Sequence, residues 1–483
     1  MTSPADQHTK AALRKMLAPL ALAQFICSFA GSNMNVMITD IKTDLNTSVQ
    51  GVQVCITLFL LIMAALMIPG GKLTDNLGRK RCFIIGLVIY GLGAVISAVA
   101  PGIGVLAVGY SLFLGVGTAL LIPPVYILVT LLFKDLKSRA WAFGVVSGMG
   151  GIGAATGPLI GGAIATGISW RAAFVFQAII VALIVLLARG VTDPLPPDPG
   201  RPRDTIGAIL SALGLMILVG GIMAADSNLA LMVVLIVVGA IILAGFFVWI
   251  RRRERSGKVA LLSTSLFRNR TSDLGMVTQN VQWAMLLGSA FVVSAYLQVV
   301  RNYNAIQTGV IFTAATVGIL LSSLVQGALA KRFQQRSLIL VGFVVAIAGM
   351  IVLVFMARGN PSPWHFAPGL FLLGTGVGVM LTPSVTIVQS AFPEAKQGEI
   401  SGLSRSVSNL GSSLGTAIGG TILVADLGHG NRSYAIAMIV LAFMGLIGLV
   451  AAIFLPRAAA PAEVEARAAQ VAVQAPKVWL GRS

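Results

Sequence analysis

Long stretches without a charged residue make up most of the chain, and short clusters of Lys, Arg, Asp and Glu separate them. A charged side chain at the bilayer centre costs about 2.5 to 3.5 kcal/mol on insertion scales, so these clusters limit where a helix crosses a membrane. A crossing helix needs roughly 20 residues. Uncharged stretches near or above that length occur at 16–39, 45–71, 82–133, 140–170, 172–188, 205–225, 227–250, 274–300, 302–330, 337–357, 359–393, 406–425 and 433–456.

One of these stretches is long enough for two helices. Within 82–133, the residues Ala100, Pro101 and Gly102 interrupt the apolar sequence near its middle. The other twelve stretches hold one helix each, and twelve plus two gives fourteen. The pattern therefore predicts an all-α integral membrane protein with fourteen transmembrane helices.

The positive charges are unequally divided between the two sides of this predicted bundle. Of 34 Lys and Arg residues, five fall opposite the N-terminus, which leaves 34 − 5 = 29 on its own side. Because Lys and Arg concentrate in cytoplasmic loops, we expect a cell (inner) membrane location with both termini cytoplasmic. The net charge of +18 then reflects topology, since its scattered clusters do not form the single basic patch of a nucleic-acid partner. The five residues opposite the N-terminus are Lys42, Arg171, Arg301, Arg358 and Arg432.

Composition argues against a water-soluble enzyme. The chain is 57% hydrophobic and 10% charged, whereas soluble domains have roughly 25% charged residues. The cysteines Cys27, Cys55 and Cys82 have neither metal nor redox spacing. No nucleophile with its base and no phosphate loop stands out, so we expect no enzyme activity, no metal and no cofactor.

The sequence also contains an internal repeat at a period of 256 to 259 residues. This spacing predicts two pseudo-symmetric six-helix bundles with an inserted helix pair, bounded as tail 1–15, first bundle 16–190, linker with inserted helices 191–270, second bundle 271–457 and tail 458–483. The repeat is read from Gly71 and Gly327 (327 − 71 = 256), Gly115 and Gly374 (374 − 115 = 259), and Gly153 and Gly411 (411 − 153 = 258).

The segment between the second and third predicted helices, GKLTDNLGRKR at 71–81, resembles the cytoplasmic signature of the major facilitator superfamily. Gly71 and Gly78 permit a tight turn, and Asp75 is placed to cap a helix and hold the basic residues Arg79 and Lys80. The resemblance implies that Asp75 latches the two bundles on the cytoplasmic side in the outward-facing state. The expected partner is the amino end of the thirteenth helix, near 401–402; the alternative is a solvated loop.

The fifth predicted helix resembles the signature of exporters in this superfamily. Glycines spaced by four let another helix approach closely, and Pro158 kinks the span. The alternative is ordinary packing of small residues. WRAAF at 170–174 and YLQVVRNYNAIQTG at 296–309 are similar to the fourteen-helix drug:proton antiporter branch. The predicted hinge residues are Gly153, Gly157, Pro158, Gly161 and Gly162.

The sequence departs from that branch where proton coupling is expected. Ala30 stands at the position of the first-helix aspartate, and Ser111 at that of the fourth-helix arginine. Acids within the membrane usually mark proton relays, and no acid falls near mid-membrane. Two acids near helix ends, Asp40 and Asp273, are left as coupling candidates, although interfacial water or helix capping also explains them.

The resemblance places the substrate cavity between the first and fourth helices of each bundle. Four polar residues of the first helix, spaced by 4, 4 and 3, are predicted to share one face. Such an uncharged, aromatic-containing pocket suits neutral or amphipathic compounds, and hydrogen bonding between helices is the alternative role. The predicted cavity residues are Gln24, Ser28, Ser32, Asn35, Tyr126, Gln279, Asn280 and Trp283.

The sequence therefore predicts a monomeric secondary transporter that exports small amphipathic or drug-like compounds by alternating access, coupled to the proton gradient. One alternative is a uniporter or an exporter of lipids or metabolites without proton coupling. Another is a transport-inactive relative that acts as a sensor or scaffold, which the intact motifs disfavour. The expected partners are the substrate, protons and the lipid bilayer.

Overall fold

The computed structural model describes residues 4–133, 136–193, 204–224, 228–356, 362–392, 397–425 and 430–456. Thirteen helices in this part are long and apolar enough to cross a membrane, and a bent pair in α7 brings the number to fourteen. The prediction of fourteen spans is thereby confirmed. Residues 4–14, predicted as part of a tail, continue the first helix, which begins at Pro4.

The first bundle contains six spans that alternate in direction. The first consists of α1, η1 and α2, and the fourth of α5, the π-helical η2 and α6, after a break at 99–102. The elements are α1 (Pro4–Asn33), η1 (Met34–Met37), α2 (Ile38–Asp44), α3 (Val49–Leu77), α4 (Arg79–Ala98), α5 (Ile103–Leu106), η2 (Ala107–Leu114), α6 (Gly115–Leu132), α7 (Leu136–Gly167) and α8 (Trp170–Ala188).

The second bundle repeats this arrangement after an intervening pair. That pair is α9 (Thr205–Met223) and α10 (Leu229–Arg255), followed by η3 (Thr264–Phe267). The remaining elements are α11 (Arg270–Ala295), η4 (Tyr296–Val300), α12 (Ala305–Arg332), α13 (Gln335–Met356), η5 (Pro363–Phe366), α14 (Ala367–Gln389), α15 (Gln397–Ala425) and α16 (Gly430–Ile453).

Equivalent glycines make equivalent close contacts in the two bundles. A Cβ on Gly153 of α7 would lie 2.3 Å from the Phe25 carbonyl oxygen of α1. A Cβ on Gly411 of α15 would lie 2.0 Å from the Asn280 carbonyl oxygen of α11. Backbones approach this closely only where side chains are absent. The sequence repeat is therefore a repeat in three dimensions, with α1–α7 and α11–α15 as matching pairs.

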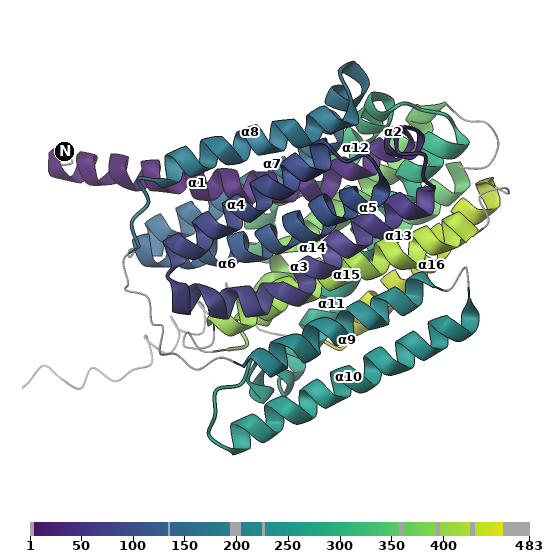
Figure 1. The fold of residues 1–483 in the computed structure, drawn as a ribbon. Helices are drawn as coiled ribbons and strands as arrows, with labels where there is room; N and C mark the ends of the chain where they lie inside the picture. Colours follow the sequence, from purple (N-terminus) through teal and green to yellow (C-terminus); the bar gives the residue numbers. More distant parts are fainter. Residues whose placement is uncertain are drawn as a thin grey trace, which may run out of the picture.

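The inserted pair α9–α10 lies along one side of the bundles, and its two helices run side by side (Figure 1). Helix α9 contacts α3 and α15, whereas the α10 span is only 11% buried inside the protein. The exposed face of α10 is rich in Val, Ile and Leu, such as Val234 and Ile241. This apolar face is suited to lipid.

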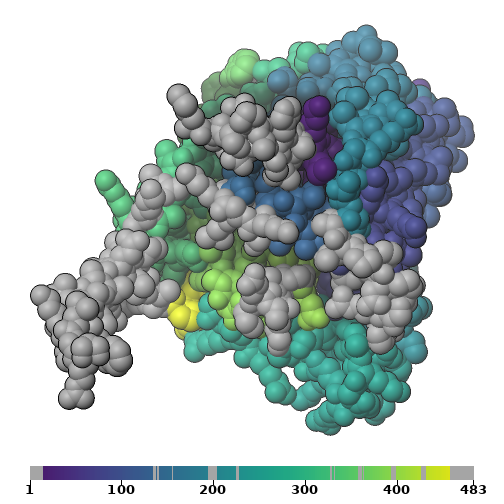
Figure 2. Space-filling model, turned by 90° about the vertical axis from the view of Figure 1, so that its left-hand side faces the viewer, coloured from purple at the N-terminus to yellow at the C-terminus, as the bar shows by residue number. Residues whose placement is uncertain are grey.

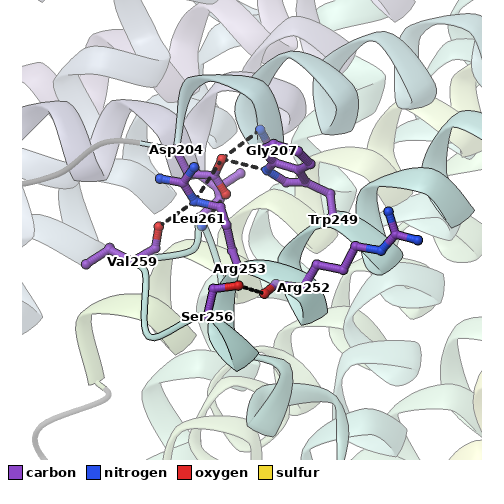
Figure 3. Close-up of polar contacts among 8 residues, drawn as sticks. All are labelled: Asp204, Gly207, Trp249, Arg252, Arg253, Ser256, Val259 and Leu261. Atoms are coloured by element: carbon purple, nitrogen blue, oxygen red, sulfur yellow. Dashed lines mark hydrogen bonds and ion pairs between the residues drawn. The ribbon is translucent and has the colours of Figure 1, made fainter.

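One buried carboxylate fixes the end of this pair (Figure 3). Asp204 accepts hydrogen bonds from the Gly207 amide (3.0 Å), the Trp249 indole (2.9 Å) and the Leu261 amide (2.9 Å). Arg253 adds an ion pair at 3.6 Å. Asp204 therefore caps α9 and ties α10 and the segment after it to the same point.

Helix α7 bends by 41° between its parts Trp141–Ala154 and Thr156–Gly167. Pro158 has no amide hydrogen for the carbonyl of Ala154, four residues earlier, and its ring crowds that carbonyl. The bend lies where this hydrogen bond is missing. Pro158 thus divides α7 into two straight segments.

The two ends of the molecule are named here by charge. The basic end contains the N-terminus, the end of α3, Lys80 and the Arg251–Arg253 cluster; Figure 2 looks onto it. The opposite end contains Asp44 and Arg171, which form an ion pair. The indole of Trp170 donates a hydrogen bond to the same Asp44 carboxylate.

Candidate functional site

Polar contacts between the two bundles close the opposite end near η1 and η4. The Asn35 carbonyl oxygen accepts hydrogen bonds from the Ser294 hydroxyl and from the Gln298 amide nitrogen, the latter at 2.8 Å. The Gln298 amide oxygen accepts from the Thr39 backbone amide at 3.1 Å. Gln298 therefore links two turns of the first bundle to the second.

A second set of contacts joins α3 to α15 towards the same end. The Gln53 amide nitrogen donates to the Thr416 and Ala417 carbonyls, at 3.3 and 3.2 Å, and to the Thr421 hydroxyl. One turn further along, the Ser413 hydroxyl donates to the Thr57 carbonyl at 3.1 Å. All six residues are buried, so no water path passes between α3 and α15 at this level.

Helices α7 and α12 form the third contact between the bundles at the opposite end. A Cβ on Gly309 would lie 2.3 Å from the Pro158 carbonyl oxygen, and a Cβ on Gly162 would lie 2.5 Å from the Ala305 carbonyl oxygen. The Ile306 amide donates to the Thr166 hydroxyl at 3.1 Å. Here the two backbones are in direct contact.

Towards the basic end the same two helices separate. Gly144, Gly148 and Gly151 lie at helical spacing on the α7 stripe that contains Pro158 and Gly162. A Cβ on any of these three would meet nothing within 4 Å. The α12 residues that continue the stripe of Gly309 are exposed, Leu320 to 40% and Leu324 to 79%. The interior between the bundles is therefore open at the basic end along α7 and α12.

On the other side of the bundles, α3 and α15 stay in contact at the basic end. Lys72 and Glu399 form an ion pair at 2.7 Å, with 27% and 28% of their side chains exposed. The Ser406 hydroxyl donates to the Ala64 carbonyl deeper in the membrane. At the basic end the bundles are therefore open between α7 and α12 and closed between α3 and α15. The Lys72–Glu399 pair across the closed side is not among the residues predicted from the sequence.

The first-bundle candidates for substrate binding divide into two groups. Gln24, Ser28 and Ser32 lie along one face of α1, where Gln24 donates to the Ser28 hydroxyl at 3.3 Å. Gln24 also lies beside Gly150 of α7. Asn35, predicted on the same face, lies in the 3₁₀ turn Met34–Met37 that follows α1. Asn35 is buried in the contacts at the opposite end.

The second-bundle candidates lie on α11 beside α15. The Gln279 amide oxygen accepts a hydrogen bond from the Ser404 hydroxyl at 2.7 Å, and the Asn280 amide nitrogen donates to the Val407 carbonyl at 3.0 Å. Asn280 therefore serves the packing of α11 against α15. Trp283 is half-buried, one turn along the helix from Gln279.

Tyr126 of α6 lies between an aromatic ring and a cation. Its ring stacks on Phe143 of α7 with centroids 5.9 Å apart, and the Arg405 guanidinium of α15 lies 4.4 Å from its centroid. The predicted pocket was uncharged, but the structure adds this guanidinium from the other bundle. The sequence signal is a single Arg in a serine-rich segment, directly before the uncharged stretch 406–425.

The sequence matches the family model described as Major Facilitator Superfamily over residues 20–416 and again over 284–481. The chain belongs to this superfamily. Its members are transporters, so the function is transport and not catalysis.

The puromycin resistance protein pur8 of Streptomyces alboniger is 29% identical to this chain, and the match covers 84% of this chain and 81% of pur8. The multidrug efflux pump LfrA of Mycolicibacterium smegmatis is 28% identical, over 88% and 83%. These relatives fit the drug:proton antiporter branch. A solved POT family transporter in complex with 5-aminolevulinic acid has a TM-score of 0.69 at 15% identity, covering 91% of this chain and 96% of that one, and shows the shared fold.

The signature segment of the superfamily forms the turn between α3 and α4. Gly78 has a φ of 90°, a left-handed conformation that favours glycine. The Asp193 carboxylate accepts from the backbone amides of Arg79 (2.6 Å) and Lys80 (3.3 Å) and thereby caps α4. The side chain of Asp75 lies outside the described residues, so its predicted role as a latch stays a prediction.

The exporter signature occupies the contact region of α7. Gly153, Gly157 and Gly161 face α1, where their Cβ atoms would meet Phe25, Ser32 and Asn33. Pro158 and Gly162 face α12 of the other bundle. The motif therefore packs α7 within its own bundle on one face and against the other bundle on the next. Its role as a hinge stays a prediction.

The two positions that depart from the drug:proton antiporters are buried and hydrogen-bonded. The Ala30 carbonyl accepts from the Tyr110 hydroxyl at 3.0 Å, and the Ser111 hydroxyl donates to the Cys55 carbonyl at 2.8 Å. Packing therefore fills the places where the resemblance implies an acid and an arginine.

The two candidate acids lie at opposite ends of the protein. Asp40 lines a cavity of about 210 Å³ at the opposite end, together with Gln298, Tyr303 and Asn304. Asp273 lies in the first turn of α11 at the basic end, where its amide donates to the carbonyl of the N-cap residue Asn269. Neither position is at mid-membrane.

Proposed function

We propose that the chain exports small amphipathic, drug-like compounds from the cytoplasm across the cell membrane. Several of its relatives are named for resistance or export, including the tetracenomycin C resistance and export protein of Streptomyces glaucescens, 27% identical over 80% of this chain and 72% of that protein. The basic end is cytoplasmic by the distribution of Lys and Arg. Substrates then enter from the cytoplasm or the inner leaflet.

The observation that most supports this proposal is the change along α7 and α12. The two helices contact at Gly162 and Gly309 and are apart at Gly148 and Leu320. An interior open on one side and closed on the other is one of the two end states of alternating access. With the basic end in the cytoplasm, it is the inward-facing state.

The proposed cycle closes the basic end and opens the opposite end. Closure brings α7 onto α12 at Gly144, Gly148 and Gly151, where the missing side chains leave room for backbone contact. Asp75 then reaches the amino end of α15, near Ser401 and Gly402, as the latch of the outward-facing state. The bend at Pro158 lets the two segments of α7 move differently.

Coupling to the proton gradient is part of this proposal, with Asp40 and Asp273 as the candidate carriers. The second candidate function is transport without proton coupling. The observation in its favour is that Ala30 and Ser111 occupy the two buried positions where the resemblance implies an acid and an arginine. The two functions differ in whether a pH gradient drives accumulation.

Everted membrane vesicles from cells that lack other efflux pumps test both. Vesicles that contain the full chain are expected to take up more dye than vesicles without it. An imposed pH gradient is expected to increase this uptake further. No uptake of any dye would refute export, and uptake indifferent to the gradient would refute proton coupling alone. Gradient-driven uptake that persists after Asp40→Asn with Asp273→Asn would exclude both acids as carriers.

A further inference from the structure

Arg405 is a charged residue inside the membrane-spanning part of α15. It lies six residues past Glu399, where the span begins, which is about 9 Å further along the helix at 1.5 Å per residue. Its side chain is half-buried and reaches from the second bundle to the Tyr126 ring of the first. A cation at this depth is unfavourable unless it meets a partner.

Three other arginines in the described part of the chain have carboxylate or carbonyl partners. Arg253 pairs with Asp204, Arg171 pairs with Asp44, and Arg336 donates to the Ala452 and Ile453 carbonyls. Among the described residues, the contact of Arg405 is the face of Tyr126. A ring face satisfies the charge in part but accepts no bidentate hydrogen bonds, so the planar N–H fork of the guanidinium is left for another acceptor.

Donor groups are also present on α11, the helix that packs against α15. Ser404, next to Arg405, donates to the amide oxygen of Gln279. The amide nitrogens of Gln279 and Gln282 on α11 are buried and have no hydrogen-bond partner. Unpaired donors are thus present on α11, which packs against α15, in addition to the guanidinium of Arg405.

The adjacent surface is aromatic. Tyr126 and Phe143 stack on each other next to the guanidinium, at the end where the interior is open. Stacked rings favour contact with a further flat apolar body. A cation beside an aromatic wall thus matches a molecule with an aromatic body and an anionic group.

We propose that Arg405, Tyr126 and Phe143 form a binding site for aromatic carboxylates. The guanidinium binds the carboxylate through two parallel N–H···O bonds, and the two rings bind the aromatic body. This proposal rests on the export function above and narrows its substrate class to compounds with an anionic group. Because Arg405 and Tyr126 belong to different bundles, a bound carboxylate takes part in the contact between them.

The test compares 1-pyrenebutyrate with its methyl ester, which keeps the aromatic body and removes the charge. Binding of each probe to the purified full chain in detergent is measured by fluorescence anisotropy. The wild-type protein is expected to bind the acid at least tenfold more tightly than the ester. Equal affinities, or no binding of the acid, overturn the proposal without any variant.

Three variants then assign the preference to the guanidinium. Arg405→Gln is expected to weaken acid binding at least tenfold and leave ester binding unchanged, and the latter also shows that the variant is folded. Arg405→Lys, which keeps the charge but loses the fork, gives an intermediate loss. Arg252→Gln, at an exposed arginine at the same end, is the matched control and leaves both affinities unchanged.

Two results separate the site from the export function. Equal weakening of acid and ester by Arg405→Gln assigns the residue a structural role and overturns the proposal. If vesicles still export dye but the protein binds 1-pyrenebutyrate no more tightly than its methyl ester, the export function stands. Only the aromatic-carboxylate site is then rejected.

Discussion

Adding one methyl group at Gly162 or Gly309 is predicted to shift the protein from the inward-facing towards the outward-facing state. Both glycines lie in the contact of α7 with α12 at the opposite end, where the two bundles separate when that end opens. Gly162→Ala and Gly309→Ala therefore act on the closed end alone. Gly148→Ala, on the same helix as Gly162, is the matched control.

The size of the effect follows from the contacts. In Gly162→Ala the new Cβ would lie 2.5 Å from the Ala305 carbonyl oxygen, and in Gly309→Ala it would lie 2.3 Å from the Pro158 carbonyl oxygen. Real Cβ atoms keep at least 3.0 Å, so the helices must separate by 3.0 − 2.5 = 0.5 Å or 3.0 − 2.3 = 0.7 Å. Overpacking of this kind costs about 1 to 3 kcal/mol, which is a factor of roughly 5 to 150 in the ratio of the two states.

Gly148→Ala is expected to shift the equilibrium in the opposite direction, towards the inward-facing state. Gly148→Ala meets nothing within 4 Å in the inward-facing state, and Ala is favoured over Gly in a helix by about 0.5 to 1 kcal/mol. Its methyl group lies in the gap that the proposed closure fills, so it favours the inward-facing state. The two interface variants and the control should therefore move the equilibrium in opposite directions.

Accessibility of single cysteines to a membrane-impermeant maleimide measures the equilibrium. A cysteine at Ser294, which is buried at the opposite end, should label faster in the Gly162→Ala and Gly309→Ala backgrounds and no faster in the Gly148→Ala background. Unchanged labelling in both interface variants, at normal expression, would show that α7 and α12 do not control this end.

Three further predictions concern the remaining contacts. Gln53→Leu removes the hydrogen bonds to α15 and should favour the outward-facing state by about 1 to 2 kcal/mol, at about 0.6 kcal/mol per contact in membranes, and faster maleimide labelling checks this. Asp204→Ala leaves its hydrogen-bond donors and Arg253 without their buried partner and should lower the free energy of unfolding by about 3 kcal/mol. Thermal unfolding in detergent, with Arg252→Gln as the control, checks this, and an unchanged midpoint would contradict it. Asp75→Asn should reduce vesicle transport at normal expression, and wild-type transport would rule out the latch.

The spans and the repeat were predictable because both depend on local sequence. Charged residues bound the apolar stretches, and matched glycines such as Gly153 and Gly411 occupy the same contact in both bundles. The close packing of α7 was likewise predicted from its glycine spacing. These features need no knowledge of how the helices are arranged in space.

The contacts between the bundles were not predictable in the same way. The Asn35 carbonyl accepts hydrogen bonds from Ser294 and Gln298 of the second bundle, and no local pattern pairs these residues. Arg405 was treated as the boundary of a span, although α15 begins eight residues earlier at Gln397 and its side chain reaches the other bundle. Which residues pair across the interface depends on the packing of both bundles, and a local pattern does not contain it.

Distances between spin labels on α7 and α12 test the alternating opening most directly. Labels at Gly148 and Leu320 report the basic end, and labels at Gln307 and at Ile168, the residue directly after α7, report the opposite end, in the full chain reconstituted in lipid. When transported dye or a pH gradient is applied, one distance is expected to shorten as the other lengthens. If both distances stay fixed, or change in the same direction while dye is transported, the two bundles do not open alternately.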